Sequence, residues 1–188
     1  MKSLRRTIWI LALGLLSLCI VAGTITAIRN QSLSTDPLSI QRLQPVDKQR
    51  LAEALHLKRE LGNRVWSGWG ESEIPHLLWN RESSFLVGYP ELPAGWEVVE
   101  GDDFNGEPYF RQDTDEPTNF AVLIDGDWVG SIATKGETDA FLVEMFQEIL
   151  PPVIESAFPY RLLLQSSEVQ ISGLLHEDFH VYQIINAR

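Results

Sequence analysis

Two histidines near the end of the chain have the spacing that a metal site needs. His176 and His180 are four residues apart, and Glu177 stands between them in the run Leu-Leu-His-Glu-Asp-Phe-His-Val-Tyr. On a helix, residues four apart lie on one face, so the two imidazoles could bind a single zinc ion. The carboxylate beside them could take a proton from a water molecule that attacks a carbonyl group. These residue types at this spacing therefore predict a hydrolytic zinc site.

The sequence around the motif predicts the helix that such a site requires. Ser167 and Gln170 have the spacing of a reciprocal N-terminal cap. The apolar residues that follow recur at helical spacing and form one stripe, made of Ile171, Leu174, Leu175, Phe179, Tyr182 and Ile185. At about 100° per residue, the two histidines fall nearly opposite this stripe. Just before the helix, residues 158–164 are predicted to form a buried strand.

The motif and its flanks resemble the zincin metallopeptidases, and the resemblance covers about residues 160–188. The extended pattern of that family has uncharged residues around the motif. Most neighbouring positions here agree with it, but Asp178 departs from it. The resemblance implies that His176 and His180 bind zinc, that Glu177 is the general base, and that the substrate is a peptide or a protein.

The sequence leaves the third zinc ligand open. The metzincin branch is excluded, because Gln183 and Asn186 stand where that branch has a glycine and a third histidine. The branch with a glutamate ligand takes it from a helix well downstream, and Arg188 comes only eight residues after His180. We therefore expect the chain to continue beyond Arg188. Upstream, the spacing does not choose among the candidates His76, Glu144 and Glu148.

The other end of the chain predicts a membrane anchor. The run from Ile8 to Ile28 carries no charged residue, and as a helix it could cross a hydrocarbon core of about 30 Å. Lys2, Arg5 and Arg6 precede it, so we expect a single pass through the cell membrane with the N-terminus in the cytoplasm. Residues 1–28 are thus predicted to be a cytoplasmic tip and anchor. A cleaved signal peptide, which would release a secreted protein, is the alternative.

The charge of the chain argues against nucleic acid as a partner. The formal net charge is −11, and the acidic residues are concentrated after residue 64, whereas the preceding part is net basic. A domain with this charge repels polyanions through its overall field. The only cysteine, Cys19, lies within the predicted anchor, so we expect no disulfide in the rest of the chain.

The remaining sequence predicts one extracytoplasmic α+β domain. Residues 29–46 are expected to be a spacer, and residues 47–62 an amphipathic helix that Asp47 begins and Gly62 ends. The domain at 63–188 begins with a β-rich region whose predicted strands are 84–89, 96–99, 108–111, 120–124 and 128–134. A helix at 137–150 follows, and then the strand and the motif helix. This order resembles the N-terminal part of a zincin-like domain.

Two functions follow from these patterns. The first is a membrane-anchored extracytoplasmic zinc metallopeptidase-like protein, in which zinc-activated water hydrolyses a peptide. The alternative is a non-catalytic extracytoplasmic interaction module, in which the motif is degenerate or incidental. Zinc content separates the first function from an incidental match, and a proteolysis assay separates an active enzyme from a degenerate one.

Overall fold

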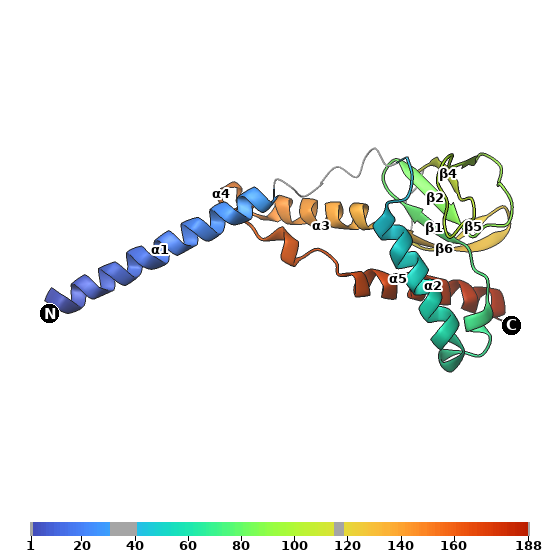
Figure 1. The fold of residues 1–188 in the computed structure, drawn as a ribbon, viewed down its shortest axis with the longest axis horizontal. Coiled ribbons are helices and arrows are strands. Elements are labelled where there is room, and N and C mark those ends of the chain that lie inside the picture. Colours follow the sequence, from blue (N-terminus) through green and yellow to red (C-terminus); the bar gives the residue numbers. More distant parts are fainter. Residues whose placement is uncertain (1, 31–40, 115–118, 188) are drawn as a thin grey trace. The chain divides into compact units, whose positions relative to one another are not determined.

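The computed structural model describes residues 2–30, 41–114 and 119–187. Its elements mix helices with one sheet, which confirms the predicted α+β class (Figure 1). The chain forms two compact units. One contains the long N-terminal helix together with Phe141–Leu164, and the other contains the sheet, the second helix and the motif helix. The spacer predicted at 29–46 lies largely outside the described residues.

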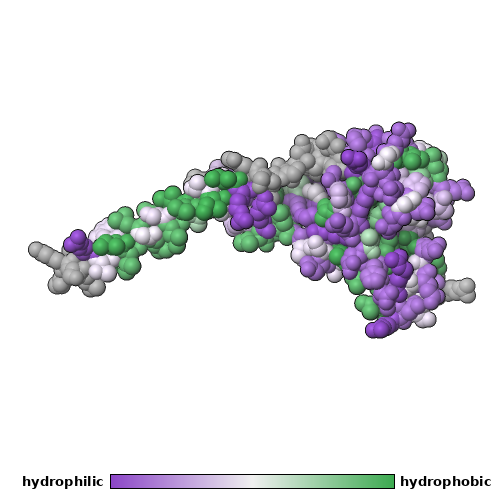
Figure 2. Space-filling model, viewed as in Figure 1, coloured by the Kyte–Doolittle hydropathy of each residue, from purple (hydrophilic) through white to green (hydrophobic). Residues whose placement is uncertain are grey.

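The N-terminal helix α1 spans Lys2–Asn30. Within its part from Arg6 to Asn30, a stretch of 18 residues has a mean hydropathy of 2.5, and none of that stretch is buried. By length and composition this helix could cross a membrane, although a signal sequence near an N-terminus has the same properties. Figure 2 shows apolar side chains along much of α1. The same unit contains the later part of α3 and two short helical segments, which are α4 (Pro152–Glu155) and the 3₁₀ turn η2 (Tyr160–Leu162).

The second unit is built on a six-stranded sheet with the order β3-β4-β2-β1-β6-β5. Neighbouring strands are antiparallel except β1 and β6, which are parallel. The strands are β1 (His76–Trp79), β2 (Ser83–Val87), β3 (Glu97–Val98), β4 (Phe110–Asp113), β5 (Phe120–Ile124) and β6 (Asp127–Ala133). Sequence analysis predicted all of these except β1.

Three helical elements accompany the sheet in this unit. They are α2 (Pro45–Val65), the 3₁₀ turn η1 (Trp69–Glu71) and α5 (Ser167–Asn186), and α3 (Lys135–Ile149) begins here as well. Helices α2 and α5 pack on one face of the sheet, where Leu51, Leu78, Phe85 and Leu174 form part of the main core. A second cluster fills the opposite face with Leu86, Trp96, Phe110 and Val129. The motif helix is thus held on both sides, by the sheet and by α2.

Three local predictions were wrong. Residues 158–164 form the turn η2 and its flanks instead of a strand, because Pro159 removes a donor and the surrounding backbone bonds to itself. Asp47 does not cap its own helix, which starts at Pro45 after Gln44; its carboxylate instead accepts a hydrogen bond from the backbone N–H of Lys135 (2.8 Å). Helix α2 also continues past Gly62 to Val65.

Candidate functional site

The motif lies in the middle of α5, a helix with a clear start. The hydroxyl of Ser166 accepts a hydrogen bond from the N–H of Val169 (3.5 Å), so the cap is one residue earlier than the predicted Ser167. The hydroxyl of Ser167 instead accepts hydrogen bonds from Arg50 on α2. The helix start is thereby fixed both by its own cap and by the neighbouring helix.

His176 and His180 lie side by side, as their spacing predicts. Their Nε2 atoms are 3.0 Å apart, and their rings meet edge to face with centroids 4.3 Å apart. His176 is exposed and His180 is half-buried. In this arrangement one ring nitrogen donates a hydrogen bond and the other accepts it. The pair is therefore already assembled at the surface of the helix.

The distance between the two Nε2 atoms suits a shared metal ion. With zinc–nitrogen bonds of about 2.0–2.1 Å, two ligands lie about 3.4 Å apart at a tetrahedral angle and about 2.9 Å apart at a right angle. The observed 3.0 Å falls between these two values. Both ring nitrogens would have to present lone pairs to the ion, so binding would replace the hydrogen bond between them. The donor set thus fits two positions of a zinc site.

Glu177 is turned toward the protein interior, contrary to a simple reading of the sequence. Its exposed fraction is 8 %, and its buried Oε2 atom has no hydrogen-bond partner among the residues that the structure describes. At this point the backbone of α5 crosses β6: a Cβ placed on Gly130 would lie 3.6 Å from the carbonyl carbon of Glu177. A buried carboxylate oxygen without a partner is costly for folding and is a feature that active sites tolerate.

Asp178, the residue that departs from the zincin pattern, anchors the helix to the core. Its exposed fraction is 1 %. Lys58 Nζ donates to Asp178 Oδ2 (2.8 Å), Trp69 Nε1 donates to Oδ1 (2.6 Å), and His76 Nε2 lies 3.3 Å from Oδ2. These contacts tie α5 to α2, η1 and β1. The carboxylate is therefore structural and does not belong to the histidine face.

The two charges of this buried cluster affect each other. Burial alone would raise the pKa of the Asp178 carboxyl, but its contacts with His76 and Lys58 outweigh burial and hold the pKa below its usual value. Burial lowers the pKa of the Lys58 ammonium, and the attraction of Asp178 offsets only part of that effect. The cluster thus favours an ionised carboxylate next to a lysine that is held in a poorly solvated position.

Of the three upstream candidates for a third zinc ligand, only His76 lies in the same unit as the histidine pair. His76 is buried against Asp178. Glu144 and Glu148 belong to the part of α3 that falls in the other unit. Within the ranges that the structure describes, no three His, Cys, Asp or Glu side chains are grouped so that they could hold a metal ion. The described part of the site therefore offers two metal ligands and one carboxylate.

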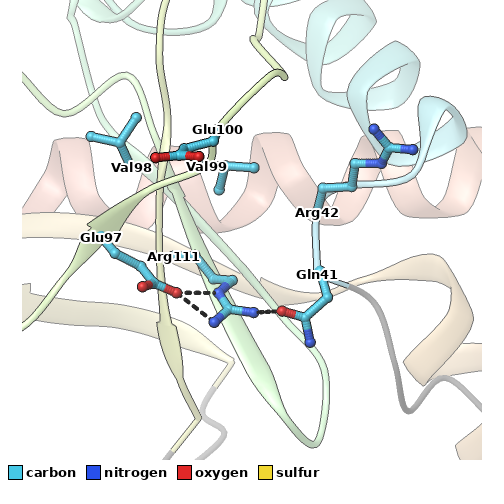
Figure 3. Close-up of a pocket in the computed structure, with 7 residues that line it drawn as sticks. All are labelled: Gln41, Arg42, Glu97, Val98, Val99, Glu100 and Arg111. Carbon is cyan, nitrogen blue, oxygen red and sulfur yellow. Dashed lines mark hydrogen bonds and ion pairs between the residues drawn. The ribbon is translucent and has the colours of Figure 1, made fainter.

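Two surface pockets lie elsewhere in the same unit. One, of about 660 Å³, is lined by residues near β3 and by Arg111 (Figure 3). The Arg111 guanidinium donates to Glu97 and Gln41, so its charge is already engaged. The other pocket, of about 770 Å³, lies between α2, η1 and the Asn105 turn, and Lys58 is among its lining residues. Neither pocket is lined by the motif histidines.

The sequence analysis did not identify Lys58 and Trp69, which hold the motif helix in place by donating hydrogen bonds to Asp178. One signal was present in the sequence, because Lys58 follows Leu51 and Ala54 at helical spacing on the apolar side of α2. A lysine at such a position requires an anionic partner, and Asp178 is the charged residue on the apolar side of the other helix. No comparable signal pointed to Trp69.

Comparisons with known proteins found no relative. No family model matches the chain, and neither a curated protein nor a solved structure matches it.

Proposed function

We propose that the chain is a membrane-anchored zinc metallopeptidase-like protein, whose sheet-bearing unit lies outside the cytoplasm. One observation carries the proposal: the imidazoles of His176 and His180 have Nε2 atoms 3.0 Å apart, a separation that fits two positions of a zinc site.

Each residue of the motif has a distinct role in the proposal. His176 and His180 would hold zinc through their Nε2 atoms. When bound, zinc would polarise the scissile carbonyl and make water a better nucleophile at neutral pH. Glu177 would accept the proton of the attacking water on Oε2, the atom without a partner. Asp178 would keep the helix fixed against α2 and the sheet, so that the histidines keep their positions.

The placement outside the cytoplasm is inferred from the sequence of α1. Arg5 and Arg6 precede the apolar run, and positive residues are retained on the cytoplasmic side. Proteolysis of sealed spheroplasts should therefore remove the sheet-bearing unit and leave α1 behind. Protection of peptides that contain Trp79 would reverse this orientation.

Zinc binding tests the site directly. We expect the purified full chain to bind zinc weakly, because two histidines leave the remaining positions to water or to a ligand outside the described residues. In calorimetric titrations, His176→Ala should abolish this binding. His56→Ala is the matched control, because His56 is an exposed histidine on α2. Unchanged zinc binding by His176→Ala would place the metal elsewhere.

Hydrolysis tests the role of Glu177. In the complete reading frame, Glu177→Gln should retain zinc and lose cleavage of a peptide library, because glutamine keeps the shape of glutamate but accepts no proton. A chelator should inhibit the wild type. Cleavage by Glu177→Gln at the wild-type rate would contradict the assignment.

A non-catalytic extracytoplasmic module is the second candidate, and the burial of Glu177 favours it. A carboxylate that points into the interior is well placed to pack and poorly placed to meet a substrate. This candidate predicts zinc binding without turnover in the complete reading frame, and it predicts that Glu177→Gln changes neither. The two experiments above therefore separate the candidates.

A further inference from the structure

The C-terminal end of α1, from Gly23 to Asn30, contacts the segment 149–162, which belongs to the same unit. Asn30 Nδ2 donates to the carbonyl oxygens of Ser156 (3.0 Å) and Phe158 (2.7 Å). A Cβ placed on Gly23 would lie 3.7 Å from Ala157 Cβ, an ordinary van der Waals distance, so the two residues are neighbours. The segment is thus docked along the last two turns of the apolar helix.

If α1 crosses a membrane, these contacts determine how deep the segment 149–162 lies in the bilayer. Gly23 precedes Arg29, the first charged residue after the apolar run, by six residues, or about 9 Å along a helix. The run from Ile8 to Ile28 is about as long as a hydrocarbon core is thick. Ala157, which lies beside Gly23, is therefore level with or below the boundary where α1 leaves the hydrocarbon.

The segment exposes large apolar side chains at this level. Leu162 is 82 % exposed, Ile149 69 % and Ile154 47 %. In water such a group of side chains would be unfavourable, whereas against lipid it would be stabilising. Glu155 and Arg161 are part of the same segment, and charged groups are costly in the hydrocarbon centre. This combination of exposed apolar side chains and charged residues fits the interfacial region, where lipid headgroups meet acyl chains.

The backbone of the segment is also suited to a place with little water. Pro151, Pro152 and Pro159 have no N–H group, and most of the other N–H groups from 154 to 163 donate to carbonyls within the segment. Asn30 provides a donor for the carbonyl of Ser156 and a second donor for that of Phe158, which already accepts from the N–H of Tyr160. Polar backbone groups near lipid must be satisfied internally, and this short irregular segment largely meets that requirement.

We propose that Ile149–Leu162 is a second membrane contact, which rests in the interfacial region of the lipid bilayer beside α1 and inserts Ile154 and Leu162 among the acyl chains. This inference rests on the proposed anchoring by α1. It deepens that proposal, because this unit would then be fixed at the membrane surface by two elements, α1 and the segment 149–162.

Depth-dependent fluorescence quenching tests the proposal in the full chain. In a Cys19→Ser background, Ile154→Cys and Leu162→Cys are each labelled with an environment-sensitive fluorophore and reconstituted into phosphatidylcholine vesicles. The native Cys19, which lies within α1, serves as the deep reference. Leu92→Cys is the matched aqueous reference, since Leu92 is an exposed leucine of the other unit.

We expect blue-shifted emission at positions 154 and 162, with stronger quenching by a nitroxide at a shallow acyl position than by one at a deep position. Cys19 should show the opposite order, and Leu92→Cys should be quenched by aqueous iodide. Labels at 154 and 162 that behave like the one at 92 would overturn the proposal. Protection from iodide without nitroxide quenching, increasing with the protein-to-lipid ratio, would also overturn it, because a second copy of the chain would then cover the segment.

Alkaline carbonate extraction separates this proposal from its premise. A chain that resists extraction, but whose labels at 154 and 162 are aqueous, would refute the interfacial contact and leave the anchor intact. A chain that carbonate releases would refute the anchor and the interfacial contact together.

Discussion

Lys58 Nζ and Asp178 Oδ2 lie 2.8 Å apart, although 120 residues separate them in the sequence. The exposed fractions of these side chains are 3 % and 1 %. Trp69 and His76 complete the surroundings of the carboxylate. The residue that makes the motif atypical thus fixes the helix on which the motif lies. The charged side chain of Asp178 does not disturb the pair formed by His176 and His180, because it points to the opposite side of α5.

Breaking this ion pair from one side should be costly. Asp178→Asn and Lys58→Met should each lower the free energy of unfolding by about 3–5 kcal/mol, because each leaves one buried charge without its partner. The double variant should lose less than the sum of the two, since neither charge remains. Urea unfolding of the full chain in detergent, followed by circular dichroism, measures all three values. Additive losses would show that the two groups do not interact.

The same pair predicts a dependence on acidic pH. The pKa of Asp178 is lower in the folded chain than in the unfolded one, so the unfolded state binds more protons between the folded pKa and about 4. The stabilisation by Asp178 should be complete above about pH 4 and should be lost as the pH falls through the folded value. The difference in unfolding free energy between wild type and Asp178→Asn should therefore shrink over that interval. A constant difference would contradict the direction of the shift.

Local signals in the sequence predicted much of the sheet. The hairpin at 120–134 was found because Asp125 and Gly126 favour a tight turn, and both have positive φ in the structure (46° and 97°). Strand β1 was missed because it has only four residues and pairs in parallel with β6, a partner about fifty residues away. The false strand at 158–164 came from an apolar run whose side chains pack around turns instead.

A close backbone contact between α2 and η1 also could not be predicted from the sequence. Gly62 was taken as a helix end, but it lies within α2, where a Cβ would stand 2.8 Å from the backbone of Gly70. Helical spacing does reveal that Gly62 shares the face of Leu51, Ala54 and Lys58. It does not reveal that η1 folds back against this face. The need for glycine here arises from that tertiary contact and not from a turn.

This contact gives a matched pair of glycine substitutions. Gly62→Ala should destabilise the chain by about 1–3 kcal/mol, since the clash is with backbone and outweighs the better helix propensity of alanine. Gly173→Ala on α5 is the control, because its added Cβ would meet only the end of the Ile132 side chain, which can move. It should be neutral or stabilising by up to about 1 kcal/mol. Equal effects in urea unfolding would refute the close approach of α2 and η1.

The histidine pair could be predicted from the sequence, whereas its relation to the carboxylates could not. Four-residue spacing on a helix places His176 and His180 together whatever the rest of the fold is. Whether Glu177 faces solvent or the sheet depends on how α5 rotates against β6. The backbone of α5 lies near Gly130, where an added Cβ would be at an ordinary contact distance of 3.5 Å from the N atom of Asp178. That rotation buries Glu177, which the pattern of apolar residues alone would have left outside, whereas the spacing of Asp178 already places it on the apolar stripe.

The buried Glu177 leads to a prediction that links stability with activity. Its unpartnered oxygen has lost water without gaining a hydrogen bond, so an apolar residue of similar size should fit the same position better. We expect Glu177→Met to raise the unfolding free energy by about 1–2 kcal/mol in the full chain, while zinc binding by the histidine pair is kept. Hydrolysis by the complete reading frame should be abolished, because methionine accepts no proton. Glu177→Gln, which keeps a polar group in the same place, should give little or no stabilisation. If Glu177→Met is instead destabilised, the carboxylate has a structural partner in the folded chain and is not free to act as the general base.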